Sequence, residues 1–277
     1  MSHRLRLGSV STGTRAPIFD AHLHIVDRRF PLVANQGYQP PPFPVEDYRA
    51  LTQSLGVVGG AVVAGSFQGC AQGWLHAAQG ALGCGFVGVA QLPPQTGAAA
   101  IRDLDAAGVR ALRFNLHRGM QTDWAALERL AHLAFDTAGW HAELYLGAAA
   151  LQALESRLAT LPAIVIDHLG LERAAQLAVL RLIDGQHPGR RVHVKASGFG
   201  RLDFDPAPVL AAIASADSRA LVFGTDLPST RAPRPFAPAD LDLLCAALAD
   251  DELIRATLWH NARQLYRLSP PASANGD

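Results

Sequence analysis

The sequence predicts a (β/α)8 TIM barrel from three observations. Short apolar runs bounded by Gly, Pro or polar residues recur eight times along the 277 residues, and such runs are typical of buried parallel strands. Ala/Leu-rich segments with helical spacing lie between them. A hydrophobic fraction of 49% with 17% charged residues supplies enough apolar material for one large core. Barrels of this class commonly form one domain of about 200 to 250 residues or more.

The eight predicted strands follow one another along the chain. They cover residues 17–25, 56–66, 84–92, 108–116, 140–146, 163–170, 191–198 and 220–228. Helical spacing between or after them is clearest over 124–139, 148–161 and 238–258. An open doubly wound sheet is the structural alternative, but it needs a glycine-rich phosphate loop after the first strand. The first strand is instead followed by IVDRRFPLVANQGYQPPPFP, which contains no such loop.

One barrel is expected over residues 17–268, with an N-terminal extension at 1–16 and a short tail at 269–277. The Pro-rich stretch 31–44 has no periodicity and is expected to fold over one end of the barrel, where long connections usually carry function. The first 16 residues lack the apolar core of a signal peptide. No stretch approaches the roughly 20 apolar residues that span a bilayer.

Charge and cysteine usage narrow the class of partner. The formal net charge is +0, so the overall attraction that drives binding to nucleic acid or to anionic membranes is missing. Cys70, Cys84 and Cys245 are odd in number and far apart, which argues against a disulfide framework. We therefore expect a cytoplasmic protein with free thiols that binds a small molecule. Its oligomeric state is not indicated.

Side chains alternate faces along a strand, so parity assigns polar residues to the barrel interior. Ionisable groups inside a barrel cost several kcal/mol unless they are paired or hydrogen-bonded, so their presence on four strands suggests a site. Lys195 is expected to form a structural ion pair with Glu143 or Asp226, with a catalytic amine as the alternative. The interior set is Asp20, His22 and His24; Arg113 and Asn115; His141, Glu143 and Tyr145; His193, Lys195 and Ser197.

Four of the polar residues stand where a barrel enzyme places its active site. His24, His168 and Asp226 lie at the carboxyl ends of the first, sixth and eighth predicted strands. His22 shares a strand face with His24, roughly 6.5 to 7 Å away by strand rise. Because the eighth strand of a closed barrel neighbours the first, these four side chains are predicted to converge.

Five motifs give the chain a family resemblance: FDAHLHIVD (19–27), VIDHLG (165–170), VKASG (194–198), FGTDLP (223–228) and NARQLY (261–266). In order and spacing they resemble the amidohydrolase superfamily over about residues 17–268. They are most similar to the amidohydrolase-related, metal-dependent-hydrolase-like TIM barrels that include 2-pyrone-4,6-dicarboxylate lactonase. The resemblance implies an amidohydrolase-type barrel in which Asp226 activates water beside His22, His24 and His168.

The resemblance also implies a set of substrate-binding residues. This sequence departs from the family pattern at two positions. Where many members carry Gly-Arg-Pro after the strand-six histidine, this chain has LGLER, so Leu171 replaces an expected arginine. The second basic residue after the fourth strand is displaced in register, which leaves His117 or Arg118 in its place. The implied substrate-binding residues are Tyr38, Ser66, Arg113, Arg118, Tyr145 and Arg201.

The predicted function is hydrolysis of a carboxylated lactone similar to 2-pyrone-4,6-dicarboxylate, with Asp226 as general base and arginines binding the carboxylates. No cofactor is required in this interpretation. Alternatively, His22, His24, His168 and Asp226 hold one zinc ion, as in a zinc-dependent decarboxylase of the same superfamily acting on an aromatic or enoic acid. A binuclear centre is not expected, because the fourth strand offers Arg113 rather than a bridging lysine. A non-catalytic barrel that binds a dicarboxylate is the remaining alternative.

Overall fold

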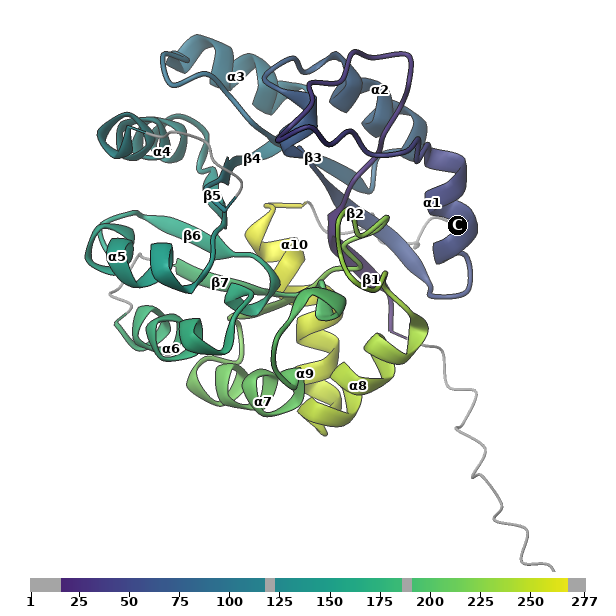
Figure 1. The fold of residues 1–277 in the computed structure, drawn as a ribbon, viewed down its shortest axis with the longest axis vertical. Helices are drawn as coiled ribbons and strands as arrows, with labels where there is room; N and C mark the ends of the chain where they lie inside the picture. Colours follow the sequence, from purple (N-terminus) through teal and green to yellow (C-terminus); the bar gives the residue numbers. More distant parts are fainter. Residues whose placement is uncertain (1–15, 118–122, 186–190, 269–277) are drawn as a thin grey trace, which may run out of the picture.

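The computed structural model describes residues 16–117, 123–185 and 191–268. Its eight parallel strands follow chain order around a nearly closed barrel (Figure 1). Asp226 N donates to His22 O at 2.7 Å, and His24 N donates to Leu227 O at 2.8 Å, which joins the end of the last strand to the first. The predicted barrel is confirmed, and the doubly wound alternative is wrong. The strands are β1 Ile18–Leu23, β2 Val57–Val63, β3 Phe86–Ala90, β4 Val109–Asn115, β5 His141–Tyr145, β6 Ala163–Ile166, β7 Arg191–Ala196 and β8 Leu221–Phe223.

Helices cover the outside of the barrel (Figure 1). No helix in the described ranges is long and apolar enough to cross a membrane. The helices are α1 Val45–Thr52, α2 Gly73–Leu82, α3 Ala98–Ala106, α4 Trp124–Ala138, α5 Ala148–Leu158, α6 Gln176–Asp184, α7 Pro206–Ala216, α8 Pro238–Leu248, α9 Asp251–Arg255 and α10 Asn261–Leu265. The predicted extension, except for its last residue, and the predicted tail lie outside the described residues.

The helical segment predicted over 238–258 is divided in the structure. Ala249 has a left-handed backbone with φ 51°, which ends α8. The carboxylate of Asp250 then accepts bonds from the backbone N–H groups of Glu252 and Leu253, which is the geometry of a helix N-cap. A π-helical turn at Ala256–His260 leads into α10. The break turns α10 toward the barrel axis (Figure 1).

The end of the barrel interior away from the carboxyl ends of the strands, its floor, holds an apolar cluster. Small and β-branched side chains of the strands pack there against residues of α10 and its end, and the ring of Tyr266 lies 5.3 Å from that of Phe19. This packing places the polar residues above an apolar floor. The cluster comprises Phe19, Ala21, Ala61, Val63, Val87, Val89, Ala111, Val165, Val222, Ala262, Leu265 and Tyr266.

Strand β1 departs from simple alternation. Phe19 and Ala21 face the interior, whereas the Asp20 carboxylate accepts bonds from the Tyr48 hydroxyl of α1 at 3.0 Å and the Thr225 hydroxyl at 2.6 Å. The register with β2 shifts between Asp20 and Leu23, so His22 also turns inward. The prediction that Asp20 shares a face with His22 and His24 is therefore wrong. Burial raises the pKa of Asp20 to about 6, although its bonds to Thr225 oppose this.

The long loop after β1 folds back on itself. Val26 and Phe43 exchange two backbone hydrogen bonds of 2.8 and 2.9 Å. Asn35 and Tyr38 exchange two more, both of 3.0 Å, around the positive-φ residues Gln36 and Gly37. Two successive positive φ angles are what a tight two-residue hairpin requires, and glycine adopts one of them without strain. This small hairpin brings Tyr38 to the mouth of the barrel.

Candidate active site

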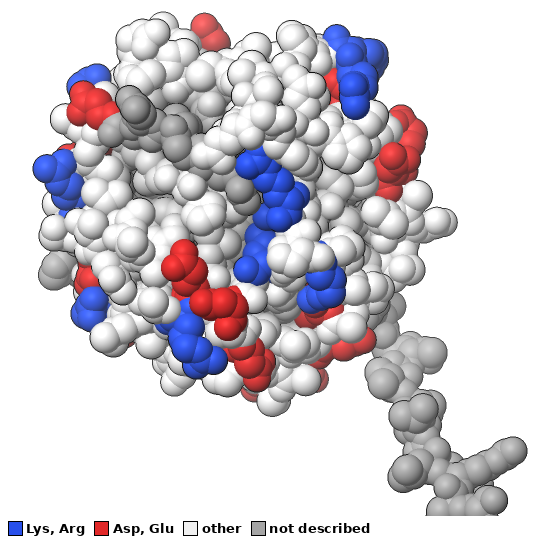
Figure 2. Space-filling model, viewed as in Figure 1, with Lys and Arg blue, Asp and Glu red and all other residues white. Residues whose placement is uncertain are grey.

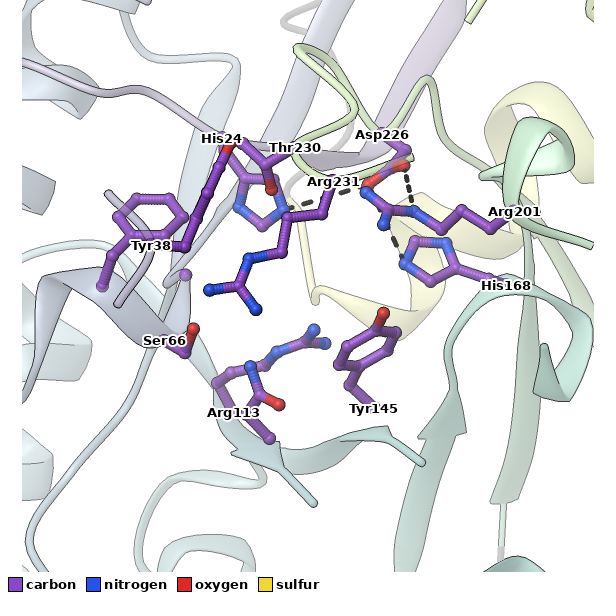
Figure 3. Close-up of a pocket in the computed structure, with 13 residues that line it drawn as sticks. His24, Tyr38, Ser66, Arg113, Tyr145, His168, Arg201, Asp226, Thr230 and Arg231 are labelled. Atoms are coloured by element: carbon purple, nitrogen blue, oxygen red, sulfur yellow. Dashed lines mark hydrogen bonds and ion pairs between the residues drawn. The ribbon is translucent and has the colours of Figure 1, made fainter. Parts of the chain in front are cut away.

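A pocket opens at the carboxyl ends of the strands. Its lining is mostly polar and comes from seven of the eight strand ends and from the first loop (Figure 3). On this face basic side chains gather at the hollowed centre, with an acidic group to one side (Figure 2). The pocket is therefore suited to a small anion. Its lining residues are His24, Tyr38, Gly65, Ser66, Phe67, Arg113, Asn115, Tyr145, His168, Arg201, Asp226, Thr230 and Arg231.

The structure brings together the four residues expected to form the centre. Asp226 Oδ1 lies 3.8 Å from His22 Nε2, 3.9 Å from His24 Nε2 and 3.8 Å from His168 Nε2. The two strand-one rings touch, with His22 Nε2 and His24 Nε2 3.3 Å apart. All four side chains are buried. One carboxylate oxygen thus faces three imidazole nitrogens.

The backbone around this centre is closely packed. His168 and Asp226 have φ of 48° and 62°, a region that side chains other than glycine seldom adopt and that is often found at functional sites. Two glycines give the rings room. A Cβ on Gly224 would lie 2.8 Å from the Cβ of His22, and a Cβ on Gly198 would lie 2.6 Å from His168 Nδ1. The glycines of FGTDLP and VKASG therefore permit the close approach of the histidines.

Hydrogen bonds on the far side of each ring indicate where its proton lies. His24 Nδ1 donates to the Val63 carbonyl at 2.8 Å, so its Nε2 carries a lone pair. Lys195 Nζ lies 3.1 Å and Asp167 Oδ1 3.4 Å from His22 Nδ1, so a bond donated by Lys195 places the proton of His22 on Nε2, and a bond donated to Asp167 places it on Nδ1. In the first of these tautomers, His22 Nε2–H can donate to His24 Nε2, 3.3 Å away, until a substrate oxygen replaces that acceptor. The Ser197 hydroxyl lies 2.9 Å from His168 Nδ1 and can fix that ring in the same way.

Burial keeps the three rings neutral. It lowers the pKa of His24 to about 3, against the opposing effect of the Val63 carbonyl. It lowers the pKa of His22 well below its usual value of 6.5, and the Lys195 charge adds to this. Burial also lowers the pKa of His168 well below that value, although Asp167 opposes the change. At neutral pH the rings therefore act as hydrogen-bonding groups without charge.

Asp226 is a buried carboxylate with one oxygen held and one oxygen facing the histidines. Arg201 Nε donates to Oδ2 at 2.7 Å. In the described part of the chain, Oδ1 accepts no hydrogen bond. Burial raises the pKa of Asp226 above its ordinary 3.8, and the Arg201 guanidinium offsets only part of this rise. A carboxylate in this setting is a stronger base than one in water.

A second buried carboxylate, Asp167, lies beside the first. Arg113 Nη1 donates to Asp167 Oδ2, while Lys195 Nζ and His22 Nδ1 lie 3.6 and 3.4 Å from Oδ1. Burial alone would raise the pKa of Asp167, but Arg113 and then His22 and Lys195 hold it well below 3.8. Lys195 also lies 2.5 Å from Glu143 Oε2, so the predicted ion pair with Glu143 is confirmed.

The structure places most of the expected substrate-binding residues in one pocket. Tyr38, Ser66, Arg113, Tyr145 and Arg201 all line it. Arg118 lies outside the described residues. His117 is within them, with its ring 5.1 Å from that of Tyr145. Leu171 is buried and is not among the described residues that line the pocket.

Sequence reasoning missed Asp167, Thr230 and Arg231. Asp167 directly precedes His168, so alternation assigns the two side chains to opposite faces. Both reach the interior because the strand ends at Ile166 and the chain turns at His168. Thr230 and Arg231 stand in the loop after β8, and loops at this end of a barrel commonly carry functional groups. That rule could have drawn attention to both residues.

Two groups of side chains in the described residues have donor atoms close enough to hold a metal ion: His22, His24 and Asp226, and His22, Asp167 and His168. His24 Nε2 and Asp226 Oδ1 each offer a lone pair. His22 Nε2 carries a proton while Lys195 donates to Nδ1, and a protonated nitrogen cannot bind a metal. While Lys195 donates to Nδ1, the first group does not fit a metal, and in the second group that bond occupies the His22 nitrogen nearest Asp167.

The model of the amidohydrolase family matches residues 19–268. The chain belongs to the amidohydrolase family. It is 27% identical over 270 residues to the 4-sulfomuconolactone hydrolase of Rhizobium radiobacter, covering 91% of this chain and 90% of that protein. A 2-pyrone-4,6-dicarboxylic acid hydrolase assigned in Pseudomonas putida has a similar structure, with a TM-score of 0.75 and 26% identity over 91% of this chain and 98% of that one.

The fold also has a close structural match in a ligand-free protein from Agrobacterium tumefaciens. The TM-score is 0.80 at 23% identity, over 94% of this amidohydrolase and 99% of that chain. At 23% identity, this similarity shows a shared fold. The family assignment made from the five sequence motifs is confirmed by the match to residues 19–268.

Proposed function

We propose that this amidohydrolase opens a lactone that carries carboxylate or other anionic substituents, by attack of a water molecule that Asp226 deprotonates. The observation that carries the proposal is the position of Asp226 Oδ1, 3.8 to 3.9 Å from three neutral imidazoles in an arginine-lined pocket. Two similar proteins are named as hydrolases of sulfomuconolactone and of pyrone dicarboxylate, both of them anionic lactones. The reaction class is hydrolysis of a cyclic ester.

The chemistry needs only one base. Asp226 Oδ1 takes a proton from water while the water oxygen bonds to the lactone carbonyl carbon, and the carbonyl electron pair moves to its oxygen. Collapse of this tetrahedral intermediate restores the carbonyl and breaks the ring carbon–oxygen bond. The proton held by Asp226 passes to the leaving oxygen. The new carboxylic acid then releases the second proton of the water to solvent, so the product carries one new carboxylate and one new hydroxyl or enol.

The histidines take different parts in this scheme. The Nε2–H of His22 donates toward the oxyanion, and the Nε2–H of His168 does the same when the Ser197 hydroxyl donates to its other nitrogen. His24 has a lone pair at Nε2, so it orients His22 or the water rather than donating. Neutral donors stabilise a developing negative charge without first binding an anion from solvent.

The pocket arginines orient the ring. Arg113 Nε is buried and has no hydrogen-bond partner among the described residues, so it can donate to a substrate carboxylate. Its guanidinium lies 5.4 Å from the Tyr145 ring centroid. Arg201 enters from the other side of the pocket and its guanidinium lies beside Asp226 (Figure 3). Tyr38, Ser66 and Tyr145 complete the proposed binding set, and Arg118 stays an expectation.

We propose that no metal is required, because Lys195 holds His22 in the tautomer that cannot bind one. The alternative is a zinc-dependent decarboxylase, and the clustering of His22, His24 and Asp226 favours it. In that enzyme these residues would hold the ion, which would polarise the substrate carboxylate. The cytoplasmic location predicted from cysteine usage stays a prediction, as does a small anionic molecule as the binding partner.

The test is a panel assay of the purified protein. It is incubated with muconolactone, 4-sulfomuconolactone and 2-pyrone-4,6-dicarboxylate, and with aromatic and enoic acids as decarboxylation substrates. Ring opening is followed by loss of lactone absorbance and by proton release, and decarboxylation by carbon dioxide. Ring opening without carbon dioxide is the expected result. Release of carbon dioxide would favour the decarboxylase, and saturable binding without any reaction would favour a non-catalytic barrel.

A further inference from the structure

The junction between β8 and β1 carries reacting groups but has no strand ladder. Each described strand pairs with the next from β1 to β8, and within residues 16–117, 123–185 and 191–268 no ladder joins β8 back to β1. Two backbone bonds cross the junction instead, from Asp226 N to His22 O at 2.7 Å and from His24 N to Leu227 O at 2.8 Å. Further contacts are needed to fix Asp226 relative to the two histidines.

The side chain of Asp20 in β1 supplies such contacts. Its Oδ1 accepts bonds from Thr225 N at 2.8 Å and from His22 N at 3.2 Å. Its Oδ2 accepts bonds from the Thr225 hydroxyl at 2.6 Å and from the Tyr48 hydroxyl at 3.0 Å. Hydrogen bonds to a carboxylate are roughly twice as strong as those between neutral groups. The fully buried Asp20 therefore ties the segment after β8 firmly to β1.

Thr225 connects this carboxylate to the proposed base, because it directly precedes Asp226. The hydroxyl that donates to Asp20 also accepts a bond from Leu227 N at 3.2 Å. The backbone N–H groups of residues 225, 226 and 227 are thus all bonded, to Asp20 Oδ1, His22 O and Thr225 Oγ1. The residues on both sides of Asp226 are held, which sets the direction in which its side chain leaves the backbone.

Asp226 needs this support because its backbone conformation is unfavourable. Its φ is 62°, and a positive φ at a residue with a side chain persists only where surrounding contacts impose it. The conformation places Oδ1 3.8 to 3.9 Å from the Nε2 atoms of His22, His24 and His168. A reacting group that moves by about 1 Å can lose about 10²-fold in rate. The bonds of Asp20 oppose such a movement.

We propose that Asp20 is a positioning residue, which acts through Thr225 to hold Asp226 in its left-handed conformation with Oδ1 toward the three histidines. This inference rests on the proposed role of Asp226 as base and adds a residue to that reaction. Asp20 is not among the described residues that line the pocket. Its loss is therefore expected to lower the rate of turnover without weakening substrate binding.

The first experiment measures kcat and KM of Asp20→Asn. The amide keeps the size of the side chain but has one acceptor oxygen in place of two, so it cannot accept all four bonds. For a lactone that the wild type opens, kcat should fall by about 10- to 100-fold, and KM should change by less than about 3-fold. A loss confined to KM, or an unchanged kcat in the folded variant, would overturn the proposal.

A double variant shows whether Asp20 acts through Asp226. When the base is already absent, there is nothing left for Asp20 to position. Adding Asp20→Asn to Asp226→Asn should therefore lower the residual kcat by less than about 2-fold. Separate effects that multiply in the double variant would mean that Asp20 acts independently of Asp226, and the proposal would be wrong.

Substitutions of its partners test the route through Thr225. Thr225→Val has the same shape without the hydroxyl and should reproduce most of the loss of kcat, whereas Thr225→Ser keeps the hydroxyl and should retain most of the activity. Tyr48→Phe is the matched control, because it removes one bond to the same carboxylate but none to the segment after β8. It should lower kcat by less than about 3-fold. Equal losses in Tyr48→Phe and Thr225→Val would contradict this route.

Crystal structures of the wild type and of Asp20→Asn separate this inference from the proposed function, because they need no turnover. In the variant, Asp226 should leave its positive φ and Oδ1 should move away from the histidine nitrogens. If no lactone is opened but this movement is seen, the proposed reaction fails and the positioning role stands. An Asp226 that keeps its place in the variant overturns the role. Thr225→Val supplies the same comparison if thermal unfolding shows that Asp20→Asn does not fold.

Discussion

The two sides of the pocket each hold a buried aspartate, in opposite electrostatic settings. On the strand-eight side, Asp226 pairs with one arginine of the described residues, Arg201, and its pKa is raised by burial. On the strand-six side, Asp167 lies near Arg113 and Lys195, and its pKa is held well below its ordinary value despite equal burial. One more positive charge is the main difference between the two carboxylates.

This difference separates a base from a structural anion. A carboxylate whose charge is compensated by neighbouring cations has little tendency to take a proton. Asp167 is therefore a poor base, and its role is to hold Arg113, Lys195 and His22 in position. Asp226 is compensated on Oδ2 only, which leaves Oδ1 able to accept a proton from water. The same residue type therefore serves two purposes within one cluster because of the number of cations around it.

Replacing the proposed base should have the largest effect on activity. Asp226→Asn keeps the size of the side chain but cannot take a proton from water, so kcat for lactone opening should fall by about 10² to 10⁴. Binding of a dianionic ligand should survive, because the pocket arginines remain. Steady-state kinetics together with calorimetric binding measure the two quantities. Undiminished turnover would exclude Asp226 as the base.

Replacing Asp167 should mainly lower the stability of the folded protein. Asp167→Asn leaves Arg113 and Lys195 buried with less compensation, and breaking a buried ion pair costs about 3 to 5 kcal/mol. The free energy of unfolding, from urea denaturation, should fall by that amount, whereas Asp226→Asn should change it less. If both variants lost equal stability and equal activity, the distinction between the two aspartates would be wrong.

The pH dependence of the reaction should follow Asp226. Its protonated form cannot accept a proton, so kcat/KM should be low below the pKa, rise with pH through it, and reach a plateau above it. Because burial raises this pKa, the midpoint should lie above 3.8. Histidine should add no rise near 6.5, since burial lowers the pKa of His22, His24 and His168. The residual kcat/KM of Asp226→Asn should not rise with pH over this range. A rise that persisted in the variant would have to come from another ionisable group.

Of these changes, removal of bound metal ions should have the smallest effect on activity. With the proposed bond from Lys195 keeping the proton of His22 on Nε2, dialysis against a chelator should change kcat by less than about 2-fold. Elemental analysis before and after dialysis serves as the control that the metal content was altered. A large loss of activity that added zinc restores would assign His22, His24 and Asp226 to a metal and make Asp226 a ligand.

Strand order and most of the pocket could be predicted from sequence, because apolar runs and strand-end polar residues depend on local pattern. Alternation predicted the inward side chains of β4, β5 and β7 correctly. It failed at Asp20, where the register shifts, and at Asp167, where the chain turns after Ile166. Arg231 could not be placed, because its position depends on a hairpin almost two hundred residues earlier in the chain.

The floor of the barrel has a consequence for how the protein is made. Tyr266 donates its hydroxyl proton to Glu143 at 2.6 Å, lies against Phe19, and supports the carboxylate that pairs with Lys195. Lys195 in turn contacts His22. A nascent chain that has not yet released Tyr266 from the ribosome therefore lacks the lowest member of this series of contacts. We expect activity only after Tyr266 has left the ribosome, so chains that end before this residue would not act on substrate.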